Sequence, residues 1–428
     1  MTGVSMTSVS VTGSGRQVPV LAGTQVLGGV AVASGVAVNG LLARQLTGSD
    51  ALAGIAQTVG VLGAAACAVP LSRLAGARGR RPALVTGQLL GAAGGLASIL
   101  AAVERSYPLL LLGAALFGGG VAAGLQGRYA AIDGMPADRR GRALSLVVWA
   151  TTVGSVVGPN LSAPGASLAD SIGLPVLAGP YLFSVTTFVA AAVVVWSLLR
   201  PDPLRPGGAG RPVGTVPAAA TTGALAPARH RLRASMVAVG ETPPARLGLV
   251  AVGTAHAVMV AVMMMTPVHL QNHGAGLDVV GFVISAHIAG MYALSPVFGA
   301  LSDQFGRVVV IRIGLVALAT ATVLAGTAGD ADHVRLGVAL AVLGIGWSAC
   351  VVGGSTLLSE SVADDRRTGV QGLSDLVMGL AAAVAGALSG PVLGGPGYSV
   401  LNALAALLLV PVAVLVAVPR RRVVAVGN

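Results

Sequence analysis

The stretch Gly299-Ala-Leu-Ser-Asp303-Gln-Phe-Gly306-Arg307 separates two long apolar segments in the second half of the chain. A weaker copy, Ser72-Arg-Leu-Ala-Gly76-Ala-Arg-Gly79-Arg80-Arg81-Pro82, separates two apolar segments at the equivalent place in the first half. In both copies glycine permits a tight turn, and arginine follows it. This repeat predicts two similar halves, each with a short basic turn after its second apolar segment.

Apolar segments of about 20 residues recur along the whole chain, and each is long enough to cross a hydrocarbon core of about 30 Å. The chain has 428 residues, of which 54% are hydrophobic and 10% charged, and its mean hydropathy is +0.85. We therefore expect an all-α polytopic membrane protein. Twelve transmembrane helices are predicted, at residues 18–42, 51–72, 83–103, 108–129, 143–163, 177–199, 247–268, 278–299, 308–328, 335–358, 370–391 and 398–418.

The basic charge indicates membrane orientation rather than nucleic-acid binding. The net charge is +11, but aromatic residues make up only 3% of the chain and offer no platform for stacking bases. With the N-terminus inside, 23 of the 26 basic residues, all arginine, lie on the cytoplasmic side, and the exceptions are Arg44, Arg105 and Arg335. We expect both termini in the cytoplasm, a location in the cell inner (cytoplasmic) membrane, and contact with the anionic leaflet of the lipid bilayer.

The predicted helices divide six and six around a proline-rich segment. Residues 200–245 hold eight prolines together with many Gly and Ala residues, a composition that is typical of a flexible connection. The predicted organisation is a cytoplasmic tail at 1–17, an N-terminal half at 18–199, a cytoplasmic linker at 200–245, a C-terminal half at 246–418 and a tail at 419–428.

These features resemble the major facilitator superfamily over essentially the whole chain. The two basic turns are similar to its loop motif, and Gly154-Ser-Val-Val-Gly158-Pro159 is similar to its fifth-helix motif, in which small residues allow close helix packing and proline bends the helix. The resemblance implies two six-helix halves around a midplane substrate site. It assigns a gating or structural role to Gly76, Gly79, Arg80, Arg81, Gly299, Asp303, Gly306, Arg307, Gly154, Gly158 and Pro159.

The chain departs from the superfamily pattern at two places. Gly76 stands where an aspartate is usual, which puts the charge relay of the inner gate in the first half in doubt. The arginine that proton-coupled exporters carry within the fourth helix is absent, since the only arginine of that segment, Arg128, lies near its cytoplasmic end. We expect Arg128 to pair with Asp133, either as part of an inner gate or as a plain interface ion pair.

Two predicted helices carry sulfur and imidazole, in the stretches His256-Ala-Val-Met259-Val-Ala-Val-Met263 and His287-Ile-Ala-Gly-Met291. Residues four apart share one helix face. Thioether sulfur favours Cu(I), imidazole binds copper well, and an ionisable group inside a membrane span indicates a functional site. We predict a copper site made by Met259, Met263, His287 and Met291, with His256 extending the path inward. The alternatives are packing by the methionines and a satisfied interhelical hydrogen bond by His287.

The expected depths place these ligands along a route from the outer mouth. At 1.5 Å per residue, Met263 lies about 6 Å and Met259 about 12 Å below the end of the seventh span, which we expect near Pro267. His287 lies about 13 Å deep on the eighth span, nearly level with Met259, and Met291 follows at about 20 Å. His269 and His273, in the predicted loop beyond Pro267, would either capture metal at the mouth or be ordinary solvated side chains.

Met-x-x-x-Met in the seventh helix and His-x-x-x-Met in the eighth resemble the signature of CcoA-like copper importers within the same superfamily. This resemblance implies secondary import of copper, with copper as cargo rather than prosthetic group and a cytoplasmic copper acceptor as partner. The thioethers favour Cu(I), and transport of Cu(II), or of copper with a small chelator, is the alternative. Relatives of that group carry riboflavin, so import of riboflavin or another small organic solute is an alternative. A drug/proton exporter and a membrane copper sensor are further alternatives.

Enzymatic and ATP-driven functions are not expected from this sequence. It has no glycine-rich phosphate loop with lysine, and lysine is absent altogether. No catalytic triad or carboxylate pair is apparent.

Overall fold

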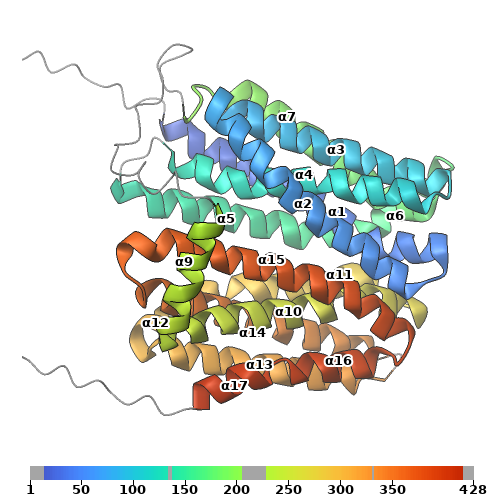
Figure 1. Cartoon of the computed structure of the whole chain (residues 1–428). Helices are drawn as coiled ribbons and strands as arrows, with labels where there is room; N and C mark the ends of the chain where they lie inside the picture. The colour runs from blue at the N-terminus through green and yellow to red at the C-terminus, as the bar shows by residue number, and fades with distance from the viewer. Residues whose placement is uncertain (1–13, 134–136, 205–227, 330–331, 418–428) are drawn as a thin grey trace, which may run out of the picture. The chain divides into compact units, whose positions relative to one another are not determined.

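The computed structural model describes residues 14–133, 137–204, 228–329 and 332–417, and the description below is confined to them (Figure 1). Helices dominate this part of the chain, in which no β-strand occurs. Eleven helical segments of it are long and apolar enough to cross a membrane. The all-α polytopic fold predicted from the apolar segments is therefore confirmed.

Two compact units make up the chain. The first unit comprises Met1–Leu42 and Val59–Thr221, and the second comprises Ala43–Thr58 and Thr222–Asn428. The helices of the first half of the chain follow in order; the end of α1 and the start of α2 belong to the second unit. They are α1 (Ser14–Thr47), α2 (Asp50–Arg78), α3 (Arg80–Val103), α4 (Tyr107–Ile132), α5 (Ala137–Asn160), α6 (Ser162–Ser171), the 3-10 turn η1 (Val176–Ala178) and α7 (Gly179–Leu198).

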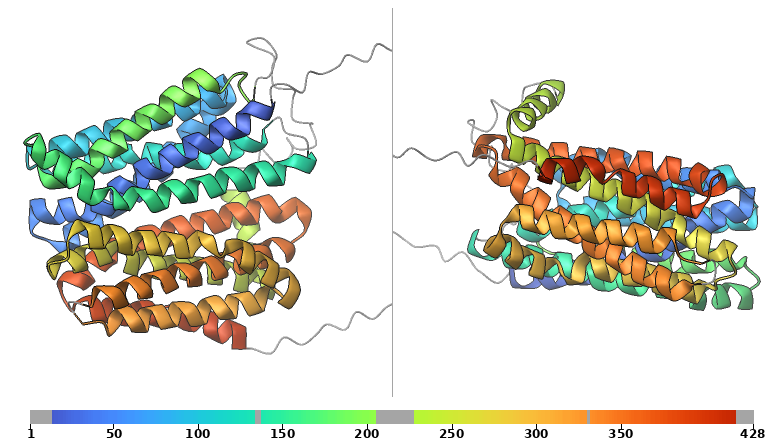
Figure 2. Two further views of the ribbon diagram at one scale, coloured as in Figure 1. Left: turned by 180° about the vertical axis from the view of Figure 1, so that it is seen from behind. Right: turned by 90° about the horizontal axis from the view of Figure 1, so that it is seen from below.

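The remaining helices all belong to the second unit. They are α9 (Ala228–Glu241), α10 (Pro243–Asn272), α11 (Leu277–Ala293), α12 (Ser295–Phe305), α13 (Arg307–Gly326), α14 (His333–Glu360), α15 (Asp364–Gly394), α16 (Tyr398–Leu407) and α17 (Val410–Ala417). Figure 2 shows from two further sides that the long helices within each unit run alongside one another.

Several boundaries differ from those expected. The eighth span is made of α11 and α12 in succession, with a break at Leu294 before Pro296, because proline fits the first turn of a new helix better than a helix interior. The fifth predicted span, 143–163, overlaps α5 (Ala137–Asn160) but is shifted from it. This helix begins with an arginine-rich turn and is not among the eleven apolar segments of the described chain. Part of the predicted linker at 200–245 is helical, since α9 lies within it.

The first unit is built around close contacts of α3 with α4 and α7. A side chain at Gly94 would overlap the backbone of Phe117, and one at Gly91 would meet the ring of Phe188 at 2.8 Å. The rings of Phe117 and Phe188 lie edge to face, with their centroids 5.2 Å apart. Small residues thus bring the helices together, and aromatic rings fill the space beside them.

The fifth-helix motif packs in the same way. Gly158 of α5 faces α1, where its absent Cβ would lie 2.9 Å from the Val30 carbonyl oxygen. Its own carbonyl accepts a hydrogen bond of 2.9 Å from the Ser34 hydroxyl, and Gly154 abuts the carbonyl of Val26. Pro159 lies inside α5, one residue before its end. The close approach expected from the small residues of this motif is present.

The second unit is organised around α14, on which α10, α11 and α13 all pack. A side chain at Gly290 of α11 would overlap the Ala341 carbonyl of α14, and one at Gly344 of α14 would overlap the His287 carbonyl. The backbones of α11 and α14 are therefore in contact at these two glycines, where no side chain separates them. This contact determines which part of α14 faces His287.

Adding a methyl group at this contact should destabilise the fold. We expect Gly344→Ala to lower the free energy of unfolding by about 1–3 kcal/mol, as overpacking does. Gly379→Ala on α15 is the matched control, because no atom lies within 4 Å of its absent Cβ and alanine is the better helix former. Thermal unfolding of the purified protein in detergent measures both variants, and equal loss in the two would contradict the packing described.

Candidate functional site

His287 lies in α11 and has no exposed surface. Its Nδ1 lies 2.8 Å from the backbone carbonyl oxygen of Leu340 on α14. Because a carbonyl oxygen only accepts, Nδ1 carries the hydrogen and Nε2 carries the lone pair. Nε2 is buried and has no hydrogen-bond partner among the described residues. An unpaired buried polar atom costs about 1–3 kcal/mol, and metal-binding histidines commonly hold one N–H on a backbone carbonyl in this manner.

His256 of α10 is engaged differently. The Trp347 indole Nε1–H of α14 donates to its Nδ1 over 3.1 Å, so the imidazole hydrogen lies on Nε2. In this arrangement the one lone pair of the neutral ring is already used. The Trp347 ring also meets the ring of Tyr292 edge to face, with centroids 6.2 Å apart. His256 thus accepts a hydrogen bond from Trp347, the partner that motif spacing did not reveal. Its place on a metal path stays a prediction.

The contacts between α10 and α14 allow depths along the two helices to be compared. Gly248 packs against Gly354, whose carbonyl oxygen lies 2.6 Å from the position of the absent Gly248 Cβ. Further along, His256 contacts Trp347. Residue numbers therefore run in opposite directions at these contacts, and the helices are antiparallel. One helical turn corresponds to about 5.4 Å along either helix.

Counting outward from the His256–Trp347 contact places the two methionines of α10. Met259 falls level with Gly344, and Met263, about 6 Å further along, falls level with Leu340. Met259 is buried, with 7% of its surface exposed, whereas Met263 is half-buried.

The same positions of α14 contact α11. Leu340 accepts the hydrogen bond of His287, and the Met291 backbone nitrogen lies 2.8 Å from the position of the absent Gly344 Cβ. The predicted ligands therefore occur in two levels about 6 Å apart. Met263 and His287 share one level, and Met259 and Met291 share the other. The sequence predicted that Met259 would be level with His287, so the observed match differs from the expected one by one helical turn.

The four predicted ligands come from two helices that contact α14 much more than they contact each other. Within the described residues no group of three His, Cys, Asp or Glu side chains could hold a metal ion. Copper binding would thus depend on the thioethers together with His287. The set Met259, Met263, His287 and Met291 stays a prediction.

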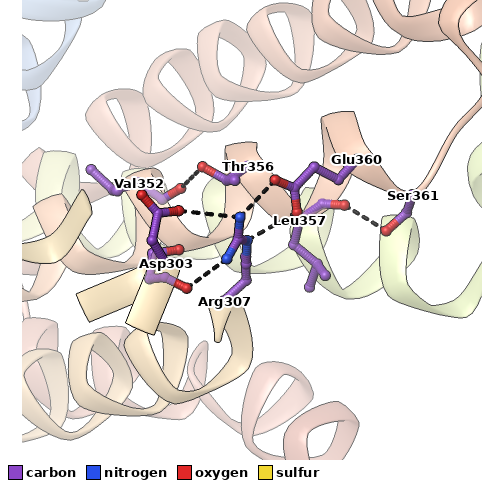
Figure 3. Close-up of polar contacts among 8 residues, drawn as sticks. Asp303, Arg307, Val352, Thr356, Leu357, Glu360 and Ser361 are labelled. Atoms are coloured by element: carbon purple, nitrogen blue, oxygen red, sulfur yellow. Dashed lines mark hydrogen bonds and ion pairs between the residues drawn. The ribbon is translucent and has the colours of Figure 1, made fainter. Parts of the chain in front are cut away.

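The basic turn of the second unit forms an ion cluster, shown in Figure 3. The Arg307 guanidinium donates from Nε and a terminal nitrogen to the two Glu360 oxygens over 2.9 and 2.8 Å, and it lies 3.2 Å from an Asp303 oxygen. Bidentate arginine–carboxylate pairs of this kind are strong and well oriented. Gly306 has φ of +92°, a conformation that glycine adopts without strain, so it lets α13 begin directly after α12. Gly299 has no neighbouring atom within 4 Å of its absent Cβ.

The first unit contains a related cluster with a different acid. Arg80 Nε donates to Asp133 Oδ2 over 2.6 Å, and Arg80 also donates to the Gln126 side-chain oxygen over 2.6 Å. Asp133 therefore pairs with Arg80 instead of the predicted Arg128. The physical reason is that Arg80 opens α3 beside the end of α4, in the position that Arg307 occupies relative to Glu360.

Asp202 supplies the acidic group that is absent at Gly76. Its oxygens accept from the backbone N–H groups of Arg80 and Arg81 over 3.1 and 2.8 Å, which satisfies donors at the start of α3. Gly79 has φ of +103°, and a side chain there would overlap the Asp202 carboxylate. Sequence reasoning missed Asp202 because it lies more than a hundred residues from the turn. The only local signal is an acid placed directly after the sixth span.

The seventh span extends beyond its expected end. Pro267 lies inside α10, which continues to Asn272. An interior proline removes one backbone hydrogen bond, and here the helix continues beyond it. His269 is therefore helical and only 7% exposed rather than part of a loop. It lies in the last turn of α10, and His273 is the residue that directly follows this helix.

Comparisons with known proteins agree on the family. The model of the Major Facilitator Superfamily matches residues 20–274 and 247–428. The uncharacterized MFS-type transporter YdeG of Bacillus subtilis is 37% identical over 91% of this chain and 89% of its own length. The riboflavin transporter RfnT of Brucella anthropi is 28% identical over 95% of this chain and 96% of its own length.

Solved structures share the fold at low sequence identity. A POT family transporter in complex with 5-aminolevulinic acid superposes with a TM-score of 0.68 at 13% identity, covering 93% of this chain and 96% of that one. The xylose transporter XylE from E. coli, in a partially occluded inward open conformation, gives a TM-score of 0.66 at 14% identity, covering 95% and 98%.

Removing the Asp202 carboxylate should make the first unit less stable to unfolding. We expect Asp202→Ala to lower the free energy of unfolding by about 0.5–2 kcal/mol, the usual cost of losing a helix N-terminal acceptor. Asp202→Asn keeps one acceptor oxygen, so its free energy of unfolding should lie between those of the wild type and Asp202→Ala. Unfolding curves of the purified variants test this, and an Asp202→Ala variant as stable as the wild type would show that the interaction contributes nothing.

Proposed function

This chain belongs to the major facilitator superfamily, and on that premise we propose that it imports copper as Cu(I) across the cytoplasmic membrane. Membership of the family accounts for secondary transport by a helical membrane protein. The choice of cargo rests on the site in the second unit. Its central observation is the buried Nε2 of His287, which carries a lone pair and has no hydrogen-bond partner among the described residues.

The surroundings of that nitrogen favour a soft metal ion. Its ring is oriented by the Leu340 carbonyl, so the lone pair is presented without a competing hydrogen bond. Met263 lies level with it, and Met259 and Met291 share the next level. Thioether and imidazole groups without carboxylate or thiolate suit Cu(I) better than Mg²⁺ or Ca²⁺.

Two levels about 6 Å apart would allow copper to move by ligand exchange. Each level supplies few ligands, so the ion would be held without being trapped. Met263 and His287 would bind it first, Met259 and Met291 would bind it next, and movement between the two halves of the fold would open the opposite side. Release to a cytoplasmic copper acceptor completes the proposed cycle.

A second candidate cargo is riboflavin. The observation that favours it is the similarity to RfnT, which extends over nearly the whole of both chains. Riboflavin binding would require a cavity with aromatic or polar groups for a planar ring, and Trp347 with Tyr292 provides such groups beside His256. A drug/proton exporter has no comparable support, because the one arginine of α4, Arg128, lies near the end of that helix and not near its middle.

Copper uptake should depend on the first level of ligands. We expect Met263→Leu and His287→Leu each to reduce uptake of radioactive copper by at least about tenfold, because each removes a ligand and leaves a side chain of similar size. Met236→Leu is the matched control, since Met236 lies on α9 and is 57% exposed. Protein levels are measured by immunoblot. Wild-type uptake in both ligand variants would rule out the site.

The riboflavin alternative has a separate test. Expression of the unaltered chain in a riboflavin auxotroph should not restore growth at limiting riboflavin if copper is the cargo. Growth equal to that of a strain expressing RfnT would instead favour riboflavin. A Trp347→Ala variant that loses this growth would then place the flavin beside α14.

A further inference from the structure

The helix α9 (Ala228–Glu241) crosses α15 instead of running alongside it. Figure 1 shows α9 lying across α15, and the right-hand view of Figure 2 shows that it stands out from the long helices of the second unit. Only Thr242 separates α9 from α10, which is long and apolar enough to span a membrane. The helix α9 is therefore joined directly to a membrane-spanning helix but runs in a different direction.

One face of α9 is packed on the rest of the second unit. Ser235, Ala238 and Val239 are buried on this face. The Ser235 hydroxyl oxygen lies 2.7 Å from the position of the absent Gly369 Cβ of α15. Val239 belongs to a buried apolar cluster with Ala245, Leu358, Val370 and Leu373. These contacts hold α9 against the first turns of α15.

The contact with Gly369 indicates the depth of α9 in the membrane. Gly369 is the first residue of Gly369–Gly394, the part of α15 that is apolar enough to span a membrane. Its 26 residues extend about 39 Å at 1.5 Å per residue, close to the thickness of about 40–45 Å that a bilayer has with its headgroup regions. The first residue of this segment, and α9 beside it, therefore lie at the level of the headgroups.

The face of α9 that points away from α15 combines apolar and basic side chains. Leu232, Met236 and Val237 are 37%, 57% and 48% exposed, and Arg233 is exposed beside them. Leu232 and Met236 lie four residues apart, as do Arg233 and Val237, so these side chains form two adjoining rows. Arg229 occupies the helix position one turn before Arg233. Large apolar side chains exposed beside arginine are typical of helices that lie in a membrane interface.

We propose that α9 lies in the membrane interface and binds anionic phospholipid headgroups. The exposed apolar side chains enter the boundary between headgroups and acyl chains, and the arginines bind the phosphate groups. Three arginines, Arg229, Arg231 and Arg233, precede the only acid of the helix, Glu241 at its far end. Guanidinium groups bind phosphate oxygens in pairs, and each basic residue near an anionic leaflet adds to the attraction. The leaflet is the one that the arginine distribution predicts to be cytoplasmic.

Lipid fits this surface better than a soluble protein or a second copy of the chain. At headgroup depth the outward face of a helix is already surrounded by lipid, so no further association is needed to cover its apolar side chains. The proposal does not depend on which cargo the protein transports.

The test uses the full chain reconstituted into lipid nanodiscs, with a bimane fluorophore at position 236. Met236→Cys supplies the labelling site, Cys67→Ser removes the partly exposed cysteine, and Cys350 is buried. We expect bromine-carrying phosphatidylglycerol to quench the fluorophore at least about twofold more than bromine-carrying phosphatidylcholine at the same mole fraction. Aqueous acrylamide should quench it little. The Cys67→Ser protein without Met236→Cys measures background labelling.

Two further variants serve as controls. Gln304→Cys places the label on an exposed residue near the end of α12, where we expect acrylamide to be the stronger quencher. Arg229→Gln/Arg231→Gln/Arg233→Gln, combined with the label at position 236, should make quenching by the two lipids equal. Thermal unfolding in detergent checks that this triple variant remains folded.

Several outcomes would overturn the proposal. Equal quenching by the two lipids with all three arginines present would show that α9 does not select anionic headgroups. Strong quenching by acrylamide at position 236 would show that this face lies in water. Protection from both lipids and acrylamide would show that protein covers it. A preference for phosphatidylglycerol that survives the triple variant would show that the arginines do not bind the headgroups.

Discussion

The backbone contact between α11 and α14 is the interaction on which the candidate site depends. Within a membrane the apolar surface of a helix gains little from leaving lipid, so close packing of small residues holds helices together. At Gly290 and Gly344 the absence of side chains brings the two backbones into contact. This places the Leu340 carbonyl within 2.8 Å of His287 and leaves the other ring nitrogen for a ligand.

The same helix, α14, receives α10 on another part of its surface. The hydrogen bond from Trp347 holds His256, and the packing of Gly248 on Gly354 aligns the two helices further along. Both helices that carry soft ligands are thereby positioned by one common support. Two histidines that look alike in the sequence differ in their hydrogen bonds, because His256 accepts one from Trp347 and His287 donates one to Leu340.

The two basic turns show how one structural requirement is met by different residues. Each turn begins a helix directly after a glycine with positive φ and places an arginine beside an acid at the end of a neighbouring helix. In the second unit Asp303 comes from the turn itself. In the first unit, where Gly76 occupies that place, Asp202 reaches the helix start from the end of α7. The acid at this helix start therefore comes from a distant part of the chain and accepts from backbone N–H groups, which spacing along the sequence could not reveal.

The sequence by itself determined the membrane class, most of the helices and the spacing of the soft ligands. Apolar length and helical periodicity are local properties, and Met259 with Met263 or His287 with Met291 share a face in any regular helix. Only the tertiary structure decided the partner of Arg80, the role of Asp202, the continuation of α10 through Pro267, and the tautomers of His256 and His287. The physical reason is that hydrogen-bond partners and helix contacts join residues far apart in the chain, and their geometry is set by packing rather than by local propensity.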